Sequence, residues 1–441
     1  MSRFTGSAVY LLALLALLIV LPSPSTFAQD VPFTIQADAD LQAALTALYG
    51  ARYDGAAPAF VEADADVLAS TDADALAAAY DGLPAYYLPD AGLVPLTENA
   101  DALAFIDFAV SPDGQEVLIG EGLLPESVTL TDSTGVEVEV PQPVRAVVSA
   151  YGPTTYYFYV LGAGDRIVMA SFLGANGPAA DTMRRIDPDF DTITSYEISQ
   201  RAINIEAVAT LDPDLIVSSA RASWADQVRE MQFPLFLVEI ETPEQVEEAM
   251  LLYGQLLGPN ALARAEAWIA YYNAIYARVT QQTATLAGED RPNVLFHGSD
   301  LLRVASGEMY QSDMIAVAGG VSASGELTGY WNDVNLEQIV TWDPDMIFLP
   351  GYGDVTRDIL LENPEYQALR AVQDGAVYDL PKLVAPWDIP GPDSALGLLW
   401  MAHTLHPDLV AFDCAAETQS FYRTFYDYQL LEEEVARLCG S

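Results

Sequence analysis

The sequence predicts an α/β protein in which two similar lobes are joined by a long helix and preceded by a small α/β domain. From residue 144 onward, short apolar segments alternate with helical ones, which is the pattern of parallel α/β sheets. Within this region the 14-residue segment 204–217 recurs as 335–348, without a gap and with 7 identical positions. A long helical segment lies between the two copies, so the repeat predicts two lobes with a helical connection.

Length and composition exclude several classes of protein. The 441 residues correspond to two or three domains of about 150 residues each. Only 18 Lys and Arg face 63 Asp and Glu, which gives a formal net charge of −45. This surface would repel nucleic acids and does not suit polybasic membrane attachment. With 51% hydrophobic and 18% charged residues, the chain is also not expected to be disordered.

Residues 1–28 have the features of a secretory signal peptide. Arg3 supplies the positive charge, and residues 8–21 form an apolar run that is too short for a span of about 20 residues. Pro22 and Pro24 follow, and residues 26–28 offer a small-residue cleavage site. An uncleaved anchor is the alternative. No cysteine follows the run, so we expect an exported, extracytoplasmic protein that is not a lipoprotein.

Residues 29–126 are rich in alanine and aspartate, with helices expected at 41–48 and 101–118. Two alternating segments, 128–130 and 136–140, predict a hairpin around the turn-forming residues 132–135. We place a domain boundary near residue 127.

The region after residue 144 supplies the strands and the connecting helix. Residues 261–286 predict one helix of about 39 Å, because apolar side chains recur on one face at three- and four-residue steps. The expected strands are 146–149, 167–170, 215–218, 235–238, 294–296, 346–349 and 377–380.

Each copy of the repeat has a local physical interpretation. Asn204 and Asn335 can cap a short helix, and Glu206 and Glu337 then occupy its second position. There the positive end of the helix dipole favours a carboxylate. Stabilisation of the helix end is the simplest role for both glutamates.

Cys414 and Cys439 are the only cysteines of the chain. In an oxidising compartment a disulfide between them would persist, and it would tie the C-terminal helical segment to itself. Two free buried thiols are the alternative, and two cysteines alone make no metal site.

Residues 128–412 resemble the type III periplasmic binding proteins of ABC importers, which bind iron–siderophores, cobalamin and haem. The similarity covers the opening hairpin and both copies of the repeat. It also covers segments 143–149, 161–167, 305–320 and 387–407. The resemblance implies two Rossmann-like lobes, a rigid connecting helix and a ligand held in the cleft between the lobes. It also implies that one glutamate per lobe, Glu206 and Glu337, docks to the permease, and that lobe closure sets their spacing.

The segment before residue 127 resembles a second family more weakly. Residues 104–115 are similar to the late helix of type II solute-binding proteins such as molybdate binders, and residues 33–37 fit their first strand. Residues 29–126 are too few for two complete lobes, so we interpret them as a truncated or remodelled form without an assigned ligand. The expected division is a signal at 1–28, this domain at 29–126, and a type III domain at 127–441 with N-lobe 127–258, connecting helix 259–288 and C-lobe 289–441.

The loops that follow the predicted strands nominate the ligand site, because ligands of open α/β sheets lie beyond the carboxyl ends of the strands. These loops carry aromatic rings and a few cations, which suit a bulky, partly apolar ligand with negative oxygens. For any single aromatic, ordinary packing is the alternative. The candidate ligand-binding residues are Tyr151, Arg221, Trp224, His297, Arg303, Tyr310, Trp331, Tyr352, Lys382 and Trp387.

Metal binding and catalysis are not expected. Of the three histidines, His403 and His406 suit surface or capping roles, and only His297 could be an axial ligand to a haem or corrinoid metal. No phosphate-binding loop, serine elbow or Cys/His nucleophile pair is present. The sequence thus predicts a monomeric substrate-binding protein of an ABC importer, without a cofactor, that captures a metal chelate such as an iron–siderophore. The alternatives are a receptor for cobalamin, haem, molybdate or tungstate, and an extracellular sensor or scaffold with the same fold.

Overall fold

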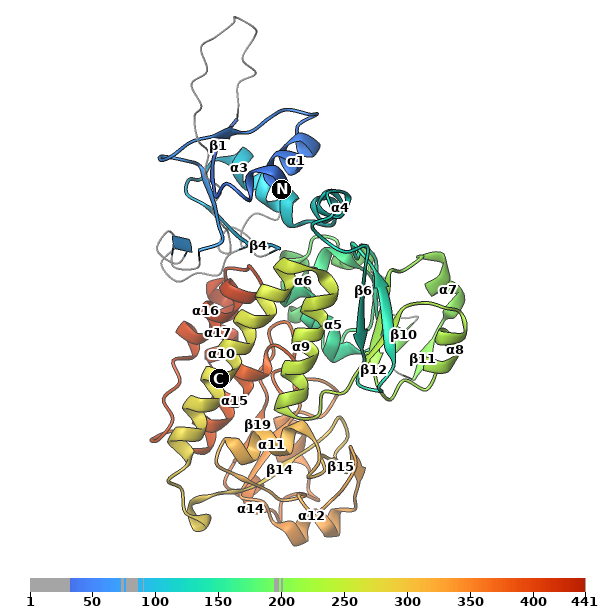
Figure 1. Cartoon of the computed structure of the whole chain (residues 1–441). Coiled ribbons are helices and arrows are strands. Elements are labelled where there is room, and N and C mark those ends of the chain that lie inside the picture. Colours follow the sequence, from blue (N-terminus) through green and yellow to red (C-terminus); the bar gives the residue numbers. More distant parts are fainter. Residues whose placement is uncertain are drawn as a thin grey trace, which may run out of the picture.

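A computed structural model describes residues 32–72, 75–76, 86–89, 91–193, 198–199 and 201–440. The expected signal segment, 1–28, lies outside the described residues. No helix in the described ranges combines the length and apolarity needed to cross a membrane. The chain forms a small N-terminal unit, two lobes and a long helix that runs beside the C-terminal helices (Figure 1).

The N-terminal unit is built on a mixed five-stranded sheet with the order β2-β1-β3-β5-β4. β1 is parallel to β2 and β3, whereas β5 is antiparallel to β3 and β4. The strands are β1 (Thr34–Ala37), β2 (Ala59–Phe60), β3 (Val67–Ser70), β4 (Tyr86–Leu88) and β5 (Ala91–Pro95). The helices are α1 (Gln42–Arg52), α3 (Ala100–Val110) and α4 (Pro112–Gly120).

The single helix expected at 101–118 is wrong, because the chain turns at Ser111. This residue is extended, with φ −71° and ψ 167°, and its side chain accepts a hydrogen bond from the Gly114 N–H at the start of α4. Pro112 occupies the first turn of α4, where its missing N–H costs no helical hydrogen bond.

The N-lobe follows an antiparallel hairpin of β6 (Ser127–Thr131) and β7 (Glu137–Pro141). Its sheet is parallel throughout and has the order β13-β12-β8-β9. The strands are β8 (Val147–Ser149), β9 (Ile167–Ala170), β12 (Leu215–Ser219) and β13 (Leu235–Val238). The helices include α5 (Gly152–Val160), α6 (Pro178–Ile186), α7 (Ile205–Thr210), α8 (Ala225–Glu230) and α9 (Pro243–Leu257).

The C-lobe repeats this architecture with a parallel sheet of order β16-β14-β18-β19. A two-stranded antiparallel ladder of β15 (Arg303–Val304) and β17 (Asn332–Asp333) is hydrogen-bonded to the chain at the end of β14, through the pair His297 and Val304. The sheet strands are β14 (Asn293–Phe296), β16 (Val321–Ser322), β18 (Met346–Leu349) and β19 (Val377–Asp379). The helices include α11 (Tyr310–Val317), α12 (Leu336–Trp342), α13 (Arg357–Glu362) and α14 (Arg370–Gln373).

The sequence repeat is also a structural repeat. Asp212 and Asp343 both adopt a left-handed backbone, with φ of 46° and 40°. The next aspartate of each copy ties its strand to the neighbouring one. The Asp214 carboxylate accepts the N–H of Arg145 at 2.7 Å, and the Asp345 carboxylate accepts the N–H of Asn293 at 2.8 Å. The repeated Asp-Pro-Asp turn therefore aligns two neighbouring parallel strands in each lobe.

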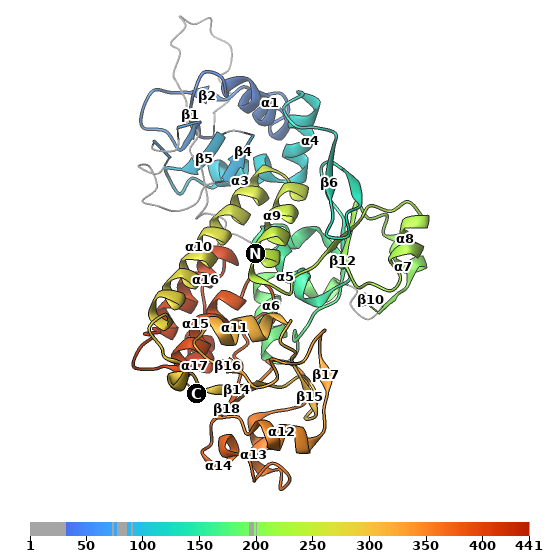
Figure 2. The same cartoon turned by 60° about the horizontal axis from the view of Figure 1, so that its bottom comes forward.

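The long helix α10 (Pro259–Thr283) runs between the lobes beside α15 (Ser394–Leu405), α16 (Cys414–Phe425) and α17 (Glu432–Cys439), as Figure 2 shows. One continuous hydrophobic core extends from the N-lobe through this helix into the C-lobe. It includes Val217, Trp268, Phe296 and Leu399, each at most 1% exposed. The lobes are therefore joined by shared packing as well as by a covalent connection.

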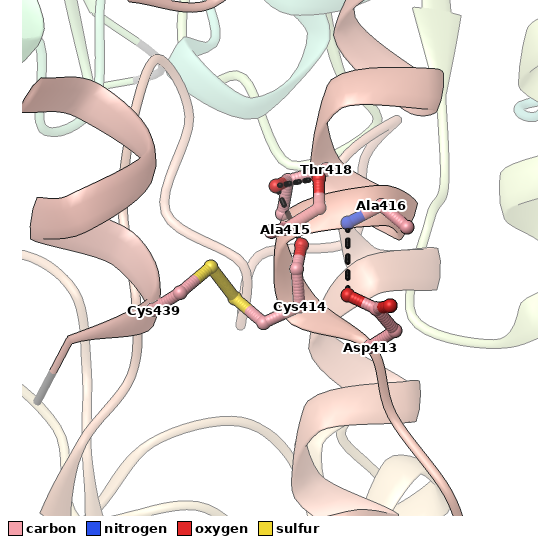
Figure 3. The surroundings of a disulfide bond; sticks show 6 residues. All are labelled: Asp413, Cys414, Ala415, Ala416, Thr418 and Cys439. Atoms are coloured by element: carbon pink, nitrogen blue, oxygen red, sulfur yellow. Dashed lines mark hydrogen bonds between the residues drawn. A yellow bond between two sulfur atoms is a disulfide. The ribbon is translucent and has the colours of Figure 1, made fainter. Parts of the chain in front are cut away.

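The C-terminal helices are fastened to one another and to the N-lobe. Cys414 and Cys439 form a disulfide between α16 and α17, with a Cα–Cα distance of 5.7 Å (Figure 3). The carboxylate of Glu434 on α17 is fully buried and lies 2.6 Å from the Arg185 guanidinium on α6. This ion pair connects the end of the chain to the N-lobe.

Candidate ligand-binding cleft

A cavity of about 800 Å³ lies between the two lobes. The N-lobe contributes residues that follow β8, β9, β12 and β13, and the C-lobe contributes residues that follow β14 and that lie around α11. The lining includes Tyr151, Ser171, Phe172, Arg201, Arg221, Glu241, Ser299, Asp300, Arg303, Met309, Gln311, Tyr330, Trp331 and Tyr352. Five of the ten expected ligand-binding residues are therefore on the cavity: Tyr151, Arg221, Arg303, Trp331 and Tyr352.

Arg221 is the central cation of the cleft. It lies just beyond β12, and its Nη2 atom is 2.8 Å from Glu241 Oε1 and donates to Tyr151 Oη at 3.2 Å. Burial by itself lowers the pKa of Arg221, but the facing Tyr151 and Glu241 groups raise it overall. Burial raises the pKa of Glu241, and Arg221 opposes this effect. Arg221 is thus a permanent cation held in place by a carboxylate of the same lobe.

Tyr330 of the C-lobe reaches across the mouth of the cleft to this cation. The guanidinium carbon of Arg221 lies 3.7 Å from the centroid of the Tyr330 ring, which is a cation–π contact. The Tyr330 hydroxyl donates a hydrogen bond to Glu239 Oε1 at 2.9 Å. These two contacts join the lobes at the rim of the cavity.

The C-lobe wall combines one cation with two aromatic rings. Arg303 on β15 pairs with Asp333 on β17 at 3.1 Å. Trp331 lies against Gly298, where an added Cβ would approach the indole to 3.0 Å. Burial raises the pKa of Tyr352, so its hydroxyl stays protonated at neutral pH. The wall offers aromatic surface and hydrogen-bond donors to a ligand.

Tyr310 and Trp387 were expected at the ligand, but the structure buries both in the core between the lobes. Tyr310 is fully buried, and its hydroxyl lies 2.9 Å from that of Tyr272 on α10 and donates to Ser394 at 2.8 Å. Trp387 is also fully buried, with its backbone closely packed against Gly397 of α15. Tyr310 is the first residue of α11 and Trp387 lies in a loop after β19, but both contact the connecting or C-terminal helices.

Trp224, His297 and Lys382 also lie off the cavity. The Trp224 indole donates to Ser199 O at 2.9 Å and packs inside the N-lobe. His297 is fully buried, and burial lowers its pKa to about 4, so its ring is neutral and does not reach the cleft. The Lys382 ammonium lies 3.4 Å from Asn176 Oδ1 of the N-lobe. The suggested axial-ligand role of His297 has no support in this geometry.

Several lining residues were absent from the expected set. Ser171 and Phe172 directly follow β9, so the strand-end rule could have found them. Glu241 lies three residues beyond β13, but a lone carboxylate did not fit the expected cationic site. Arg201 precedes α7 and carried no recognisable signal.

Glu206 and Glu337 lie on the surface, one on each lobe. Both are exposed at the second position of short helices, α7 and α12. Asn204 and Asn335 cap these helices by accepting backbone N–H groups at 3.1 Å and 2.8 Å. Among the described residues neither glutamate carboxylate has a hydrogen-bond or ion-pair partner, so both are open to a partner protein.

The described ranges contain no metal site built from protein side chains. No group of three or more His, Cys, Asp and Glu side chains there is arranged to hold an ion. His403 Nδ1 and His406 Nε2 donate hydrogen bonds to the carbonyl oxygens of Val410 and Gly319, at 2.7 Å and 3.1 Å.

Comparison with known proteins identifies the class. Residues 147–383, more than half of the chain, match the family model of periplasmic binding proteins, and the chain belongs to this family. The family comprises type III substrate-binding proteins of ABC transporters and not enzymes. The protein is therefore a solute-binding protein of an ABC transporter, and its relatives are periplasmic.

Three relatives illustrate the similarity. The molybdate-binding protein MolA of Haemophilus influenzae is 22% identical over 336 residues, which cover 70% of this chain and 93% of MolA. A vitamin B12-binding protein of Photorhabdus laumondii is 25% identical over 232 residues, or 52% of this chain and 78% of the relative. A solved periplasmic solute-binding protein of Veillonella parvula has a TM-score of 0.60 and 26% identity, covering 71% of this chain and 96% of its own.

Proposed function

We propose that the protein captures a metal chelate, most simply an iron–siderophore, in the cavity between its lobes and delivers it to an ABC permease. The observation that supports this ligand class is the size and lining of the cavity. A volume of about 800 Å³ falls in the range of sites for drug-sized molecules. The aromatic residues Tyr151, Phe172, Trp331 and Tyr352 supply flat apolar surface for a bulky ligand.

The charges of the cleft argue against a bare oxyanion. Arg221 is already paired with Glu241, and Arg303 with Asp333. Glu241 and Asp300 also line the cavity, and they would repel a small dianion. A chelate spreads its negative oxygens over a large body, so it can contact the arginine edges while its apolar parts cover the rings. The relatives include a molybdate-binding protein and a vitamin B12-binding protein, so sequence similarity does not point to one ligand class. The proposed ligand class therefore rests on the residues that line the cavity.

We further propose that Glu206 and Glu337 dock the two lobes to the permease, and that residues 1–28 direct export. Both carboxylates are exposed, unpaired within the described residues and repeated at the same position of each lobe. A basic residue of a partner could pair with each of them without breaking an existing contact.

One experiment tests ligand and docking together. Ferric siderophores of the hydroxamate and catecholate types, haem, cobalamin and molybdate are titrated while tryptophan fluorescence is followed, because Trp331 lines the cavity. We expect a ferric siderophore to quench at micromolar concentrations or below. The double variant Glu206→Ala plus Glu337→Ala should keep this affinity but lose uptake with the cognate permease. Glu230→Ala plus Glu362→Ala, which also removes two exposed carboxylates, is the control for charge.

Two results would contradict the proposal separately. Tight binding of molybdate without a response to any chelate would overturn the ligand class. Normal uptake by the double glutamate variant would overturn the docking role and leave the ligand class standing.

A further inference from the structure

The hydrophobic core shared by the two lobes limits how a ligand can reach the cavity. Trp268 on the connecting helix packs in the same buried cluster as Val217 of the N-lobe and Phe348 of the C-lobe. A wide rotation of one lobe would break this packing and the ion pair of the buried Glu434 carboxylate with the partly exposed Arg185. Movements that accompany ligand entry are therefore expected to be small and local to the cavity.

Tyr330 bridges the two lobes at one edge of the cavity. Its ring covers the Arg221 guanidinium at 3.7 Å, and its hydroxyl donates to Glu239 at 2.9 Å, so one C-lobe side chain bridges two N-lobe residues. Both Tyr330 and Arg221 belong to the cavity lining. Tyr330 is also 40% exposed, so water competes for its contacts from the outside.

The backbone beneath Tyr330 is held in place. Two residues further on, Asn332 belongs to the β15–β17 ladder, and its Nδ2 atom donates to the carbonyl oxygen of Tyr330 at 2.9 Å. On the other side, the Gly329 N–H donates to Glu308 Oε2 at 2.6 Å. With both flanks fixed, a change of the Tyr330 side-chain rotamer can open the mouth without unfolding the loop.

We propose that Tyr330 is the gate of the ligand cavity, and that rotation of its side chain away from Arg221 and Glu239 controls the rate of ligand access. The proposal rests on the function proposed above, since it regulates the same site. Opening breaks one hydrogen bond to a carboxylate and one cation–π contact, and both are partly exposed. It also uncovers the face of Arg221, so the group that the gate shields becomes available to an anionic part of the ligand.

The first test needs no ligand. Both cysteines of the chain form the disulfide, so Ser171→Cys places a single free thiol on the cavity wall. We measure the rate of its reaction with a maleimide in ligand-free protein. Tyr330→Ala should raise this rate about tenfold, because two contacts of roughly equal strength are lost. Tyr330→Phe retains the ring over Arg221 and should raise it less.

Matched controls separate gating from general loosening. Leu302→Ala removes a side chain of equal exposure, 40%, from the neighbouring turn, and it should leave the labelling rate unchanged. A thiol introduced by Asp226→Cys, whose side chain is 99% exposed, should react at the same rate with and without Tyr330→Ala.

The second test measures ligand association by stopped-flow fluorescence with a ferric siderophore. Tyr330→Ala should raise the association rate constant by a factor similar to that for thiol labelling. If the thiol introduced by Ser171→Cys reacts at the same rate with and without Tyr330→Ala, the gate is overturned, whatever the ligand. Faster labelling without binding of any ferric siderophore would support the gate and refute an iron–siderophore as the ligand.

Discussion

Asp107 offers a quantitative test of how the N-terminal unit joins the binding lobes. It lies on α3 and faces a second cavity, of about 480 Å³, whose lining also includes Arg264 and Asp427. Asp427 pairs with Arg264 at 3.0 Å, whereas Asp107 has no hydrogen-bond or ion-pair partner among the described residues. Burial, and secondly the charge of Asp427, raise the pKa of Asp107 from 3.8 to about 6.

The sign of the effect follows from the raised pKa. The folded protein holds the Asp107 proton more tightly than the unfolded chain does, so the folded state is favoured at low pH and this contribution is lost as pH rises through about 6. Fully developed, a pKa change from 3.8 to about 6 corresponds to roughly 3 kcal/mol. This figure is an upper limit, because water in the cavity can solvate the carboxylate. Asp107→Asn removes the charge at nearly constant shape.

We expect Asp107→Asn to increase the free energy of unfolding at pH 8 by up to about 3 kcal/mol, and at pH 5 by roughly 1 kcal/mol less. Urea unfolding at both pH values measures the difference, and pH 4 is avoided because the pI is about 4.1. Asp101→Asn, an exposed position in the first turn of the same helix, is the control and should give no gain. An Asp107→Asn gain that is equal at pH 5 and pH 8, or no gain at either, would refute the assignment of a buried charge.

Two further predictions concern the C-terminal helices. Replacing Cys414 and Cys439 together by serine should lower the free energy of unfolding by about 3 kcal/mol, because the disulfide closes a loop with a sequence separation of 25 and so restricts the unfolded chain. Urea unfolding measures the change, and a loss below about 1 kcal/mol would contradict this explanation. Gly397→Ala should cost about 2 kcal/mol or more, since the added Cβ would lie 2.1 Å from the Trp387 carbonyl oxygen. Its near-ultraviolet circular dichroism should change as the Trp387 loop shifts, and a neutral substitution would show that this contact relaxes freely.

The parallel strands were the most predictable part of the fold. Ile167–Ala170, Leu235–Val238 and Met346–Leu349 have the expected bounds, because strands buried on both faces appear as continuous apolar runs. β16 was missed, since its two residues, Val321 and Ser322, are not buried and leave no such run. The split at Ser111 was missed because the apolar spacing continues from α3 into α4.

The candidate site was only partly predictable, for a geometric reason. Strand ends place a loop at the correct edge of a sheet, which brought Tyr151, Arg221 and Tyr352 to the cavity. They do not determine whether a side chain faces the cleft or the helices behind it. Tyr310, the first residue of α11, contacts Tyr272 of α10 instead. Trp387, in the loop after β19, packs against Gly397 of α15, and the positions of these helices depend on the packing of the whole molecule.

The shared core also bears on how an ABC permease could distinguish a loaded from an empty binding protein. The resemblance to the family suggested that lobe closure sets the spacing of Glu206 and Glu337. Continuous packing through Trp268 opposes a large closure, so the spacing of the two glutamates is largely fixed before a ligand binds. The difference between the two states must then arise near the cleft, where Tyr330 either bridges Arg221 and Glu239 or is displaced. If the two glutamates dock to the permease as proposed, their docking geometry would be constant, and the side chains around the cavity would signal whether a ligand is bound.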